Sequence, residues 1–461
     1  MHEEENEFRR ENDSIYYEES KLEETIKKGW NKSLKNQRKR ILSKSIIIIL
    51  PVFIIFIMSI NFSPAFADFV RTIPGFEYIV NIVQFDKGLQ LAVENNYVQH
   101  IDQSATKEDI TFTVKDIIVD NDRMIIFYRL EGNGRDKRIL LKNVSILDED
   151  GEVIKAGYSY GSGNDNFLEK KYIEGRIDVF NIENKESEKV VLKLNLLTGD
   201  ERKQEFEMKK VKDLTIPIEI DREYFKRAEK KYEINQWVEV EGQRIHFMDM
   251  TIYPTRIALH VKYDPSNKKK ILEFRDLVIE DEKGEFPKIT NGSVGRKISD
   301  DEEIIYMQSD FFNAPEKIKI SGSKLMALDK DKMTVEIDLD QKKIIKAPDS
   351  RLKLLDITTK EEQNNRTGEN EKFRILFFEL EGLVDQNYHY NIFKSDMIIN
   401  GKKYESNRSG SGISSLENGV IYEEYEQYFK EDEGLKGIGQ IEIYQYPSFI
   451  ETPFEIYVTD K

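Results

Sequence analysis

The chain has 461 residues, of which 39% are hydrophobic and 34% are charged, and its formal net charge is −16. This length allows two to four domains, and the negative charge excludes nucleic acid as a partner for most of the chain. The sequence contains no cysteine, which excludes disulfide frameworks, thiolate metal sites and cysteine nucleophiles. Its five histidines are scattered without metal-ligand spacing, so we expect no metal and no cofactor.

The first 44 residues form a polar tail with a short amphipathic pattern. Ser20 and Glu23 match a capping box, after which apolar residues recur every four positions at Leu22, Ile26, Trp30 and Leu34. These four residues predict one helix with a narrow apolar stripe. Two interpretations are open: the helix lies in a groove of a partner protein, or it lies on the anionic inner leaflet of a membrane.

A long uncharged apolar run follows the tail. It reads IIIILPVFIIFIM from Ile46 to Met58, and residues 45–62 make about 18 residues, or roughly 27 Å of helix, enough to cross a bilayer core. The basic residues before it carry no acid among them and include Lys35, Arg38, Lys39, Arg40 and Lys44. The positive-inside rule therefore places residues 1–44 in the cytoplasm and residues 63–461 outside.

The sequence Ala65-Phe66-Ala67 resembles a signal-peptidase site, so cleavage after the apolar run is an alternative to an uncleaved anchor. The region before the run exceeds 40 residues, which is far longer than a signal peptide carries, and we favour the anchor. Residues 63–103 then show helical spacing, interrupted at Pro74-Gly75 and at Asp86-Lys87-Gly88. We expect short helices that lie on the membrane surface or cap the first β-domain.

The remaining sequence contains three copies of one pattern. Each copy has a strand, a turn, a second strand of alternating apolar residues and a later hairpin. The landmarks of the copies are an aspartate (Asp116, Asp249, Asp356), a hairpin glycine (Gly151, Gly284, Gly401) and a phenylalanine (Phe180, Phe312, Phe429). The step from aspartate to glycine is 35 residues in two copies and 45 in the third, which carries the polar insert EEQNNRTGEN.

Regularly spaced short strands predict antiparallel β-sandwiches. The expected fold is mainly β: one N-terminal transmembrane helix, short juxtamembrane helices and three tandem immunoglobulin-like β-sandwich domains. The predicted boundaries are 1–44 for the tail, 45–62 for the span, 63–103 for the juxtamembrane segment, and 104–222, 223–347 and 348–461 for the sandwiches.

The segment after the span resembles a known family. Its matching pieces are Ser63-Pro64-Ala65-Phe66-Ala67, Ile73-Pro74-Gly75, Asp86-Lys87-Gly88-Leu89 and the tail helix Leu22–Trp30. They resemble single-span proteins of Gram-positive spore-formers, a family of unknown function often labelled anti-sigma factors because its members tend to lie beside extracytoplasmic-function sigma factors. Immunoglobulin-like modules often follow in such proteins. The resemblance implies a sigma factor as the cytoplasmic partner.

No arrangement of a nucleophile with a base stands out, so we expect no enzymatic activity and no catalytic residues. The favoured function is a membrane-anchored regulator, whose tail helix binds a sigma factor while the outer domains sense an envelope signal. The alternative is a cell-surface binding or structural protein whose sandwiches contact wall polymers or other proteins.

Overall fold

The computed structural model describes residues 77–83, 86–132, 137–160, 172–182, 187–200, 209–225, 229–282, 284, 294–313, 317–363, 370–382, 390–417, 420–432 and 434–459. Contacts divide the chain into two units, residues 1–64 and 65–461, and all described residues lie in the second. The predicted tail helix with Leu22, Ile26, Trp30 and Leu34, the basic block and the predicted span all lie outside the described residues. Within the described residues, no helix has the length and apolar character needed to cross a membrane.

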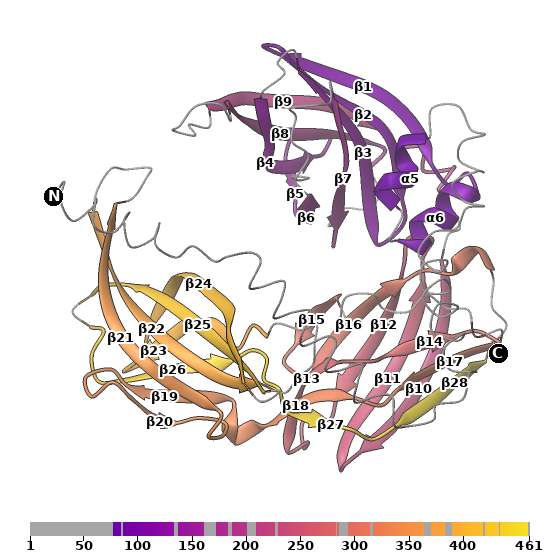
Figure 1. Cartoon of the computed structure of the whole chain (residues 1–461). Coiled ribbons are helices and arrows are strands. Elements are labelled where there is room, and N and C mark those ends of the chain that lie inside the picture. The colour runs from indigo at the N-terminus through magenta and orange to yellow at the C-terminus, as the bar shows by residue number, and fades with distance from the viewer. Residues whose placement is uncertain are drawn as a thin grey trace, which may run out of the picture. The chain divides into compact units, whose positions relative to one another are not determined.

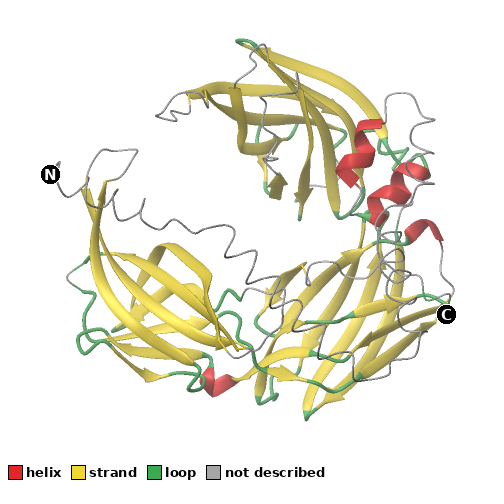
Figure 2. Cartoon of the chain, in the orientation of Figure 1, coloured by secondary structure: helices red, strands yellow, loops and turns green. Residues whose placement is uncertain are grey.

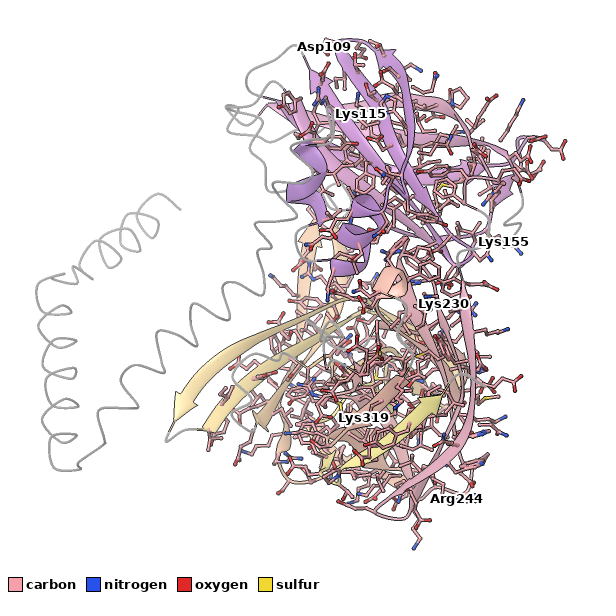
Figure 3. The ribbon with its side chains drawn as sticks, turned by 90° about the vertical axis from the view of Figure 1, so that its right-hand side faces the viewer. Asp109, Lys115, Lys155, Lys230, Arg244 and Lys319 are labelled. Atoms are coloured by element: carbon pink, nitrogen blue, oxygen red, sulfur yellow. The ribbon has the colours of Figure 1, made fainter. Side chains whose placement is uncertain are left out.

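The described part of the chain is mainly β, as predicted (Figure 2). Its helices are α5 (Glu77–Val83), α6 (Lys87–Glu94) and two single-turn 3₁₀ helices, η1 (Phe311–Asn313) and η2 (Lys330–Lys332). The strands alternate apolar and polar residues, so one face of each sheet is buried. The outer faces carry charged side chains, such as Arg244 on the second sandwich (Figure 3).

The first sandwich consists of two antiparallel sheets around one core (Figure 1). The first sheet has the order β1-β2-β3-β7-β6 and the second has the order β5-β4-β8-β9. Its strands are β1 (Gln99–Lys107), β2 (Ile110–Val119), β3 (Arg123–Gly132), β4 (Lys137–Leu147), β5 (Val153–Ile154), β6 (Gly157–Tyr160), β7 (Tyr172–Phe180), β8 (Lys189–Asp200) and β9 (Lys209–Glu219).

The second sandwich repeats this plan with a more broken second layer. One sheet has the order β10-β11-β12-β16-β15, and two short sheets, β13-β18-β27 and β14-β17-β28, cover it. The strands are β10 (Lys230–Val240), β11 (Gln243–Ile252), β12 (Arg256–Tyr263), β13 (Lys269–Phe274), β14 (Val278–Glu280), β15 (Val294–Ser299), β16 (Glu302–Gln308), β17 (Lys317–Gly322), β18 (Leu325–Asp329), β27 (Phe449–Ile450) and β28 (Phe454–Thr459).

The third sandwich is one continuous sheet of order β20-β19-β26-β23-β24-β25-β22-β21, and strands from both of its halves contribute to a single core. Strand β24 joins the halves, because its first residues pair with β23 and the rest pair with β25. The strands are β19 (Thr334–Asp338), β20 (Lys343–Lys346), β21 (Leu352–Gln363), β22 (Asn370–Gly382), β23 (Phe393–Ile399), β24 (Lys402–Glu417), β25 (Val420–Lys430) and β26 (Ile438–Ile443).

The three landmark aspartates occupy equivalent positions. In each copy the hairpin register shifts by one residue immediately before the aspartate, between Val114 and Asp116, between Phe247 and Asp249, and between Leu354 and Asp356. A β-bulge of this kind re-aims the side chain that follows it. The hairpin glycines Gly151, Gly284 and Gly401 all have φ between +73° and +82°, which explains why glycine recurs there.

The third sandwich is inserted into the second, and here the structure differs from the predicted division at residue 347. Strands β27 and β28, from the end of the chain, pair with β18 and β17 of the second sandwich. Strand β19, which precedes the predicted boundary, pairs with β26 of the third sandwich. Strands β19 to β26 therefore form the third sandwich as an insertion, after which the chain returns to the second sandwich, where β27 and β28 are edge strands.

Candidate functional site

The helix pair α5–α6 is seated on the outer face of the first sandwich, which is one of the two positions predicted for it. Apolar residues of the helices pack against a buried patch on β2 and β3 that contains Ile118, Ile125 and Phe127. The strands of a two-layer sandwich normally expose their outer face to solvent. Here β2 and β3 are also buried on the outer face at these residues, because the two helices cover it.

A buried aspartate fixes α5 to this face. The Tyr78 hydroxyl of α5 donates a hydrogen bond to Oδ2 of Asp116, and His100 Nδ1 lies 3.0 Å from Oδ1 of the same carboxylate. Asp116 is 1% exposed. Burial raises the pKa of this carboxyl, against the hydrogen bonds from Tyr78 and His100, which lower it. The landmark aspartate of the first copy thus connects the sandwich to the helix nearest the predicted span.

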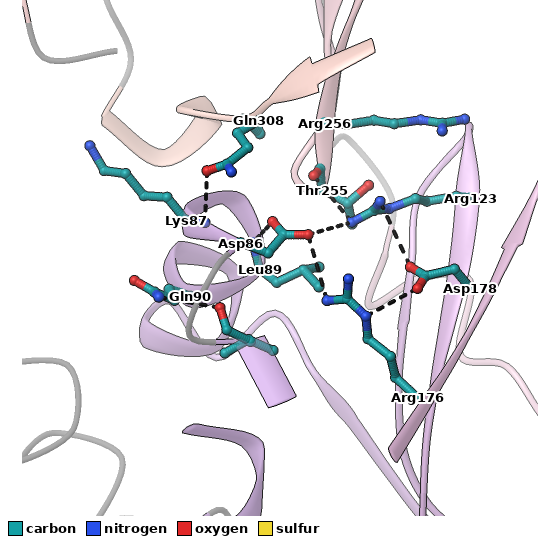
Figure 4. A network of polar contacts seen from close by, with 12 residues as sticks. Asp86, Lys87, Leu89, Gln90, Arg123, Arg176, Asp178, Thr255, Arg256 and Gln308 are labelled. Atoms are coloured by element: carbon teal, nitrogen blue, oxygen red, sulfur yellow. Dashed lines mark hydrogen bonds and ion pairs between the residues drawn. The ribbon is translucent and has the colours of Figure 1, made fainter. Parts of the chain in front are cut away.

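A second carboxylate, Asp86, begins α6 and connects it to strands β3 and β7 (Figure 4). Its Oδ1 accepts a hydrogen bond from the backbone N–H of Leu89 at 3.1 Å, the usual arrangement of an N-cap. Its Oδ2 lies 3.3 Å from Arg123 and 3.6 Å from Arg176. Arg176 Nε lies 3.0 Å from Asp178, so two arginines and two carboxylates form one network.

The same network reaches the second sandwich. Buried Asp120, in the β2–β3 turn, accepts hydrogen bonds from the backbone N–H of Thr255 at 3.2 Å and from its hydroxyl at 2.5 Å. Asp122 forms an ion pair with Arg256, whose guanidinium lies 3.5 Å from the centre of the Tyr306 ring. Thr255 and Arg256 lie at the β11–β12 turn, so equivalent hairpin turns of the first two copies face each other.

Helix α6 contacts the second sandwich directly as well. The backbone N–H of Lys87 donates to Oε1 of Gln308 at 3.1 Å. A Cβ added at Gly88 would lie 2.9 Å from the Thr255 carbonyl oxygen and 3.0 Å from the Ser309 backbone nitrogen. Only glycine permits this approach. We call these contacts among α6, the β2–β3 turn and the β11–β12 turn the junction.

The junction is held by charge and is not fully hydrogen-bonded. Within the described residues, buried Nε of Arg123, NH1 of Arg176, Oδ1 of Asp178 and NH2 of Arg256 lack hydrogen-bond partners. A partly satisfied buried network is less stable than a complete one. Burial also raises the pKa of Asp120, although the hydrogen bonds from Thr255 lower it. The junction is therefore the part of the described chain where a small rearrangement would change several interactions together.

The sequence motif Asp86-Lys87-Gly88-Leu89 lies in the junction, and its local purpose is now clear: an N-cap, a close contact and a buried Leu89. No pattern in the sequence had indicated a role for Arg123, Arg176, Thr255 or Arg256. One signal was nevertheless present, since an arginine follows the landmark aspartate by seven residues in the first two copies. In the third copy Phe373 occupies the corresponding strand position, and the adjacent Arg374 pairs with Glu431 at 2.6 Å.

The described residues offer little else for chemistry. Within them, no group of histidine and carboxylate side chains could hold a metal ion. A cleft beside the junction encloses about 420 Å³ of empty space, counting the part open to solvent. Its lining is mostly apolar, with Met124, Ile146 and Val179 among it, and its rim includes the already bonded Asp120. The main features of the site are therefore the hydrogen bonds, ion pairs and close packing that connect α6 with the first two sandwiches.

Comparison with known proteins finds two matches of unknown function. Residues 37–132 match a domain of unknown function (DUF4179), and residues 229–360 match a family of unknown function (DUF5643). The first match spans the junction motif and the β2–β3 hairpin, and the second spans most of the second sandwich. No curated protein matches the chain.

Two solved structures show limited similarity. A conserved domain protein from Bacillus anthracis is 12% identical, with a TM-score of 0.34, over 54% of this chain and 84% of that chain. An uncharacterised protein from Listeria monocytogenes is 8% identical, with a TM-score of 0.11, over 70% of this chain and 29% of that chain. The matches are consistent with a protein family whose function is unknown.

Proposed function

We propose that this chain is a membrane-anchored regulator, an anti-sigma factor whose outer, immunoglobulin-like domains sense an envelope signal. One observation carries the proposal. The helix pair α5–α6 is bonded both to the first sandwich, through Tyr78 and Asp116, and to the second sandwich, through Lys87 and Gln308. Only residues 63–76 separate this helix pair from the predicted span at 45–62.

The junction supplies a physical route for a signal. A ligand or force that moves the second sandwich shifts Thr255 and Arg256, and therefore their partners Asp120 and Asp122. Since Asp86 is bonded to Arg123 of the same turn region, α6 moves with them. Switching elements with two arrangements commonly exchange ion pairs at such interfaces. The incompletely bonded arginines favour this behaviour over a rigid joint.

On the cytoplasmic side, we propose that Leu22, Ile26, Trp30 and Leu34 hold the sigma factor. Four apolar residues on one helical face suit a groove of a partner protein. The basic residues Lys35 to Lys44 fix the tail inside the cell. The proposed partners are accordingly a sigma factor, the membrane and an unidentified ligand outside, with no cofactor.

The test uses the full chain in its native membrane. A tagged chain is expected to co-purify with a sigma factor, and replacement of Leu22, Ile26 and Trp30 by alanine is expected to abolish co-purification and raise transcription of the target genes. The matched control replaces Glu24 and Lys28 by alanine, because these residues lie on the opposite face of the predicted helix and their charges cancel.

Two outcomes contradict the proposal. The first is an absence of any bound sigma factor together with unchanged transcription on deletion of the gene. The second is a deletion that alters adhesion or wall properties while leaving transcription unchanged, which favours the alternative of a cell-surface binding or structural protein. In that alternative, the alanine replacements leave function intact because the tail serves only to stop transfer.

A further inference from the structure

A polar cleft opens in the third sandwich where β24 passes from one half of the sheet to the other. Strand β24 pairs with β23 up to Glu405 and with β25 from Ser406 onward. Two ladder irregularities coincide here: one between Phe393 and Met397 in the β23–β26 pairing, and one between Ser406 and Arg408 in the β24–β25 pairing. The resulting cleft holds about 360 Å³ of empty space, counting the part open to solvent.

The cleft is lined by hydroxyl and amide groups around one aromatic residue. Ser395, Ser409 and Gln427 contribute the polar groups, and buried Phe393 contributes the apolar surface. Ser409 and Gln427 are direct cross-strand partners on β24 and β25. Side chains of this kind both donate and accept hydrogen bonds. They suit a ligand with several hydroxyl or amide groups.

Gln427 is the second, independent observation that points to a ligand. It is 3% exposed, it lines the cleft, and its Oε1 has no hydrogen-bond partner within the described residues. The neighbouring inward-facing residues Tyr425 and Phe429 belong to the hydrophobic core. A buried amide oxygen without a hydrogen-bond partner has lost its hydration without compensation, which destabilises the site. A ligand hydroxyl placed beside it would remove this cost.

The charge in the cleft is already balanced. The Arg408 guanidinium donates to Oε1 of Glu362 at 2.7 Å, and it lies 3.9 Å from the centre of the Tyr428 ring. Because a carboxylate and an aromatic face already accompany this cation, an anionic ligand has little unpaired positive charge to meet. The chemistry favours a neutral polar ligand.

We propose that this cleft binds a neutral saccharide unit, with its hydroxyl or acetamido groups hydrogen-bonded to Gln427, Ser395 and Ser409. The volume accommodates one sugar ring, and the open side allows a longer chain to continue into solvent. The first two sandwiches differ here, because β6 and β15 each pair within a single sheet, and among their described strands none pairs in both layers. The assignment goes beyond the regulatory proposal and does not depend on it.

The experiment titrates N-acetylglucosamine, methyl glucoside and inorganic phosphate into the full chain held in lipid nanodiscs, with binding followed by saturation-transfer NMR and calorimetry. Gln427→Met removes the amide at nearly constant volume. We expect about a tenfold loss of sugar affinity, the equivalent of one good hydrogen bond of about 1.4 kcal/mol. The matched control is Gln440→Met, an exposed strand glutamine of the same sandwich, which is expected to bind as the natural chain does.

A second variant keeps the test valid if Gln427→Met fails to fold. Ser395→Ala alters an exposed side chain at the cleft wall, so it leaves the core intact and is expected to weaken sugar binding several-fold. The proposal is overturned if neither sugar binds at tens of millimolar. It is also overturned if phosphate binds in place of the sugars, or if sugar binding is the same in both cleft variants and the natural chain.

Discussion

The landmark aspartate shows how one residue acquires different roles in three copies of a domain. Asp116 is buried beneath α5 and bonded to Tyr78. Asp249 instead lies 3.1 Å from His260, whose other ring nitrogen lies 2.9 Å from Glu302. Asp356 is exposed and pairs with Lys342 at 3.0 Å. The bulge places all three side chains on the same face, but only the first has a helix above it.

This difference predicts unequal effects of alanine substitution. Asp116→Ala leaves the buried Tyr78 hydroxyl without its acceptor, so we expect the free energy of unfolding to fall by about 1–3 kcal/mol. Asp356→Ala is the matched control, and removal of its exposed ion pair is expected to change the free energy of unfolding much less, because solvent screens the pair. Urea denaturation measures both, and equal losses would contradict the proposed role of Asp116.

Asp116 also predicts a pH dependence. Burial raises the pKa of its carboxyl above the ordinary value, so between these two values the native state binds a proton that the unfolded chain does not. The contribution of Asp116 to the free energy of unfolding is therefore largest at low pH, and it is lost as the pH rises through the raised pKa. We expect Asp116→Asn, which does not titrate, to gain stability relative to the natural chain as pH increases from about 4 to 7. A constant difference between the two proteins across this range contradicts the prediction.

At the scale of elements, the third sandwich is inserted between strands of the second. Strand β28 completes the second sandwich, where Ile456 pairs with Ile320 and enters its core. The chain therefore leaves the second sandwich after β18, forms the third and returns. The second sandwich is therefore built from two separate segments, whereas the strands of the third, β19 to β26, follow one another in one continuous segment.

This arrangement predicts that two adjacent residues near the C-terminus differ sharply in importance. Ile456→Ala creates a cavity in the second sandwich and is expected to destabilise it by about 2–5 kcal/mol. Tyr457→Ala, on the opposite face of the same strand and 60% exposed, is expected to change stability by roughly 0.5 kcal/mol or less. Hydrogen exchange at β17 locates the effect. If Ile456→Ala instead reduces the protection from exchange in the third sandwich, the assignment of β28 to the second sandwich is wrong.

At the scale of the whole molecule, the junction couples the first two sandwiches. Arg256→Ala leaves buried Asp122 without its cation, which typically costs about 3–5 kcal/mol. We expect this variant to separate one shared calorimetric unfolding transition of the first two sandwiches into two. Arg244→Ala, an exposed arginine on the second sandwich paired with Asp264 at 2.9 Å, is the matched control and should leave the transition shared. A shared transition in both variants would show that the sandwiches are coupled by other contacts.

The sequence predicted the local features well because their causes are local. Alternating apolar residues predicted the strands, and the glycine turns were found at Gly151, Gly284 and Gly401 with the positive φ expected. The break at Asp86 between two short helices was also predicted, and it is an N-cap. The partners of Asp86 were not predicted, since Arg123 and Arg176 are distant in sequence and nothing in their spacing indicates contact with α6.

The sequence by itself determined that the described chain is mainly β, that its domains are repeats, and that their turns require glycine. These are properties of short segments, where periodicity and backbone conformation act directly. Only the tertiary structure decided which copy supplies each edge strand and which aspartate becomes buried. An edge strand pairs through backbone groups that every sequence carries, so its partner depends on where the rest of the chain places it.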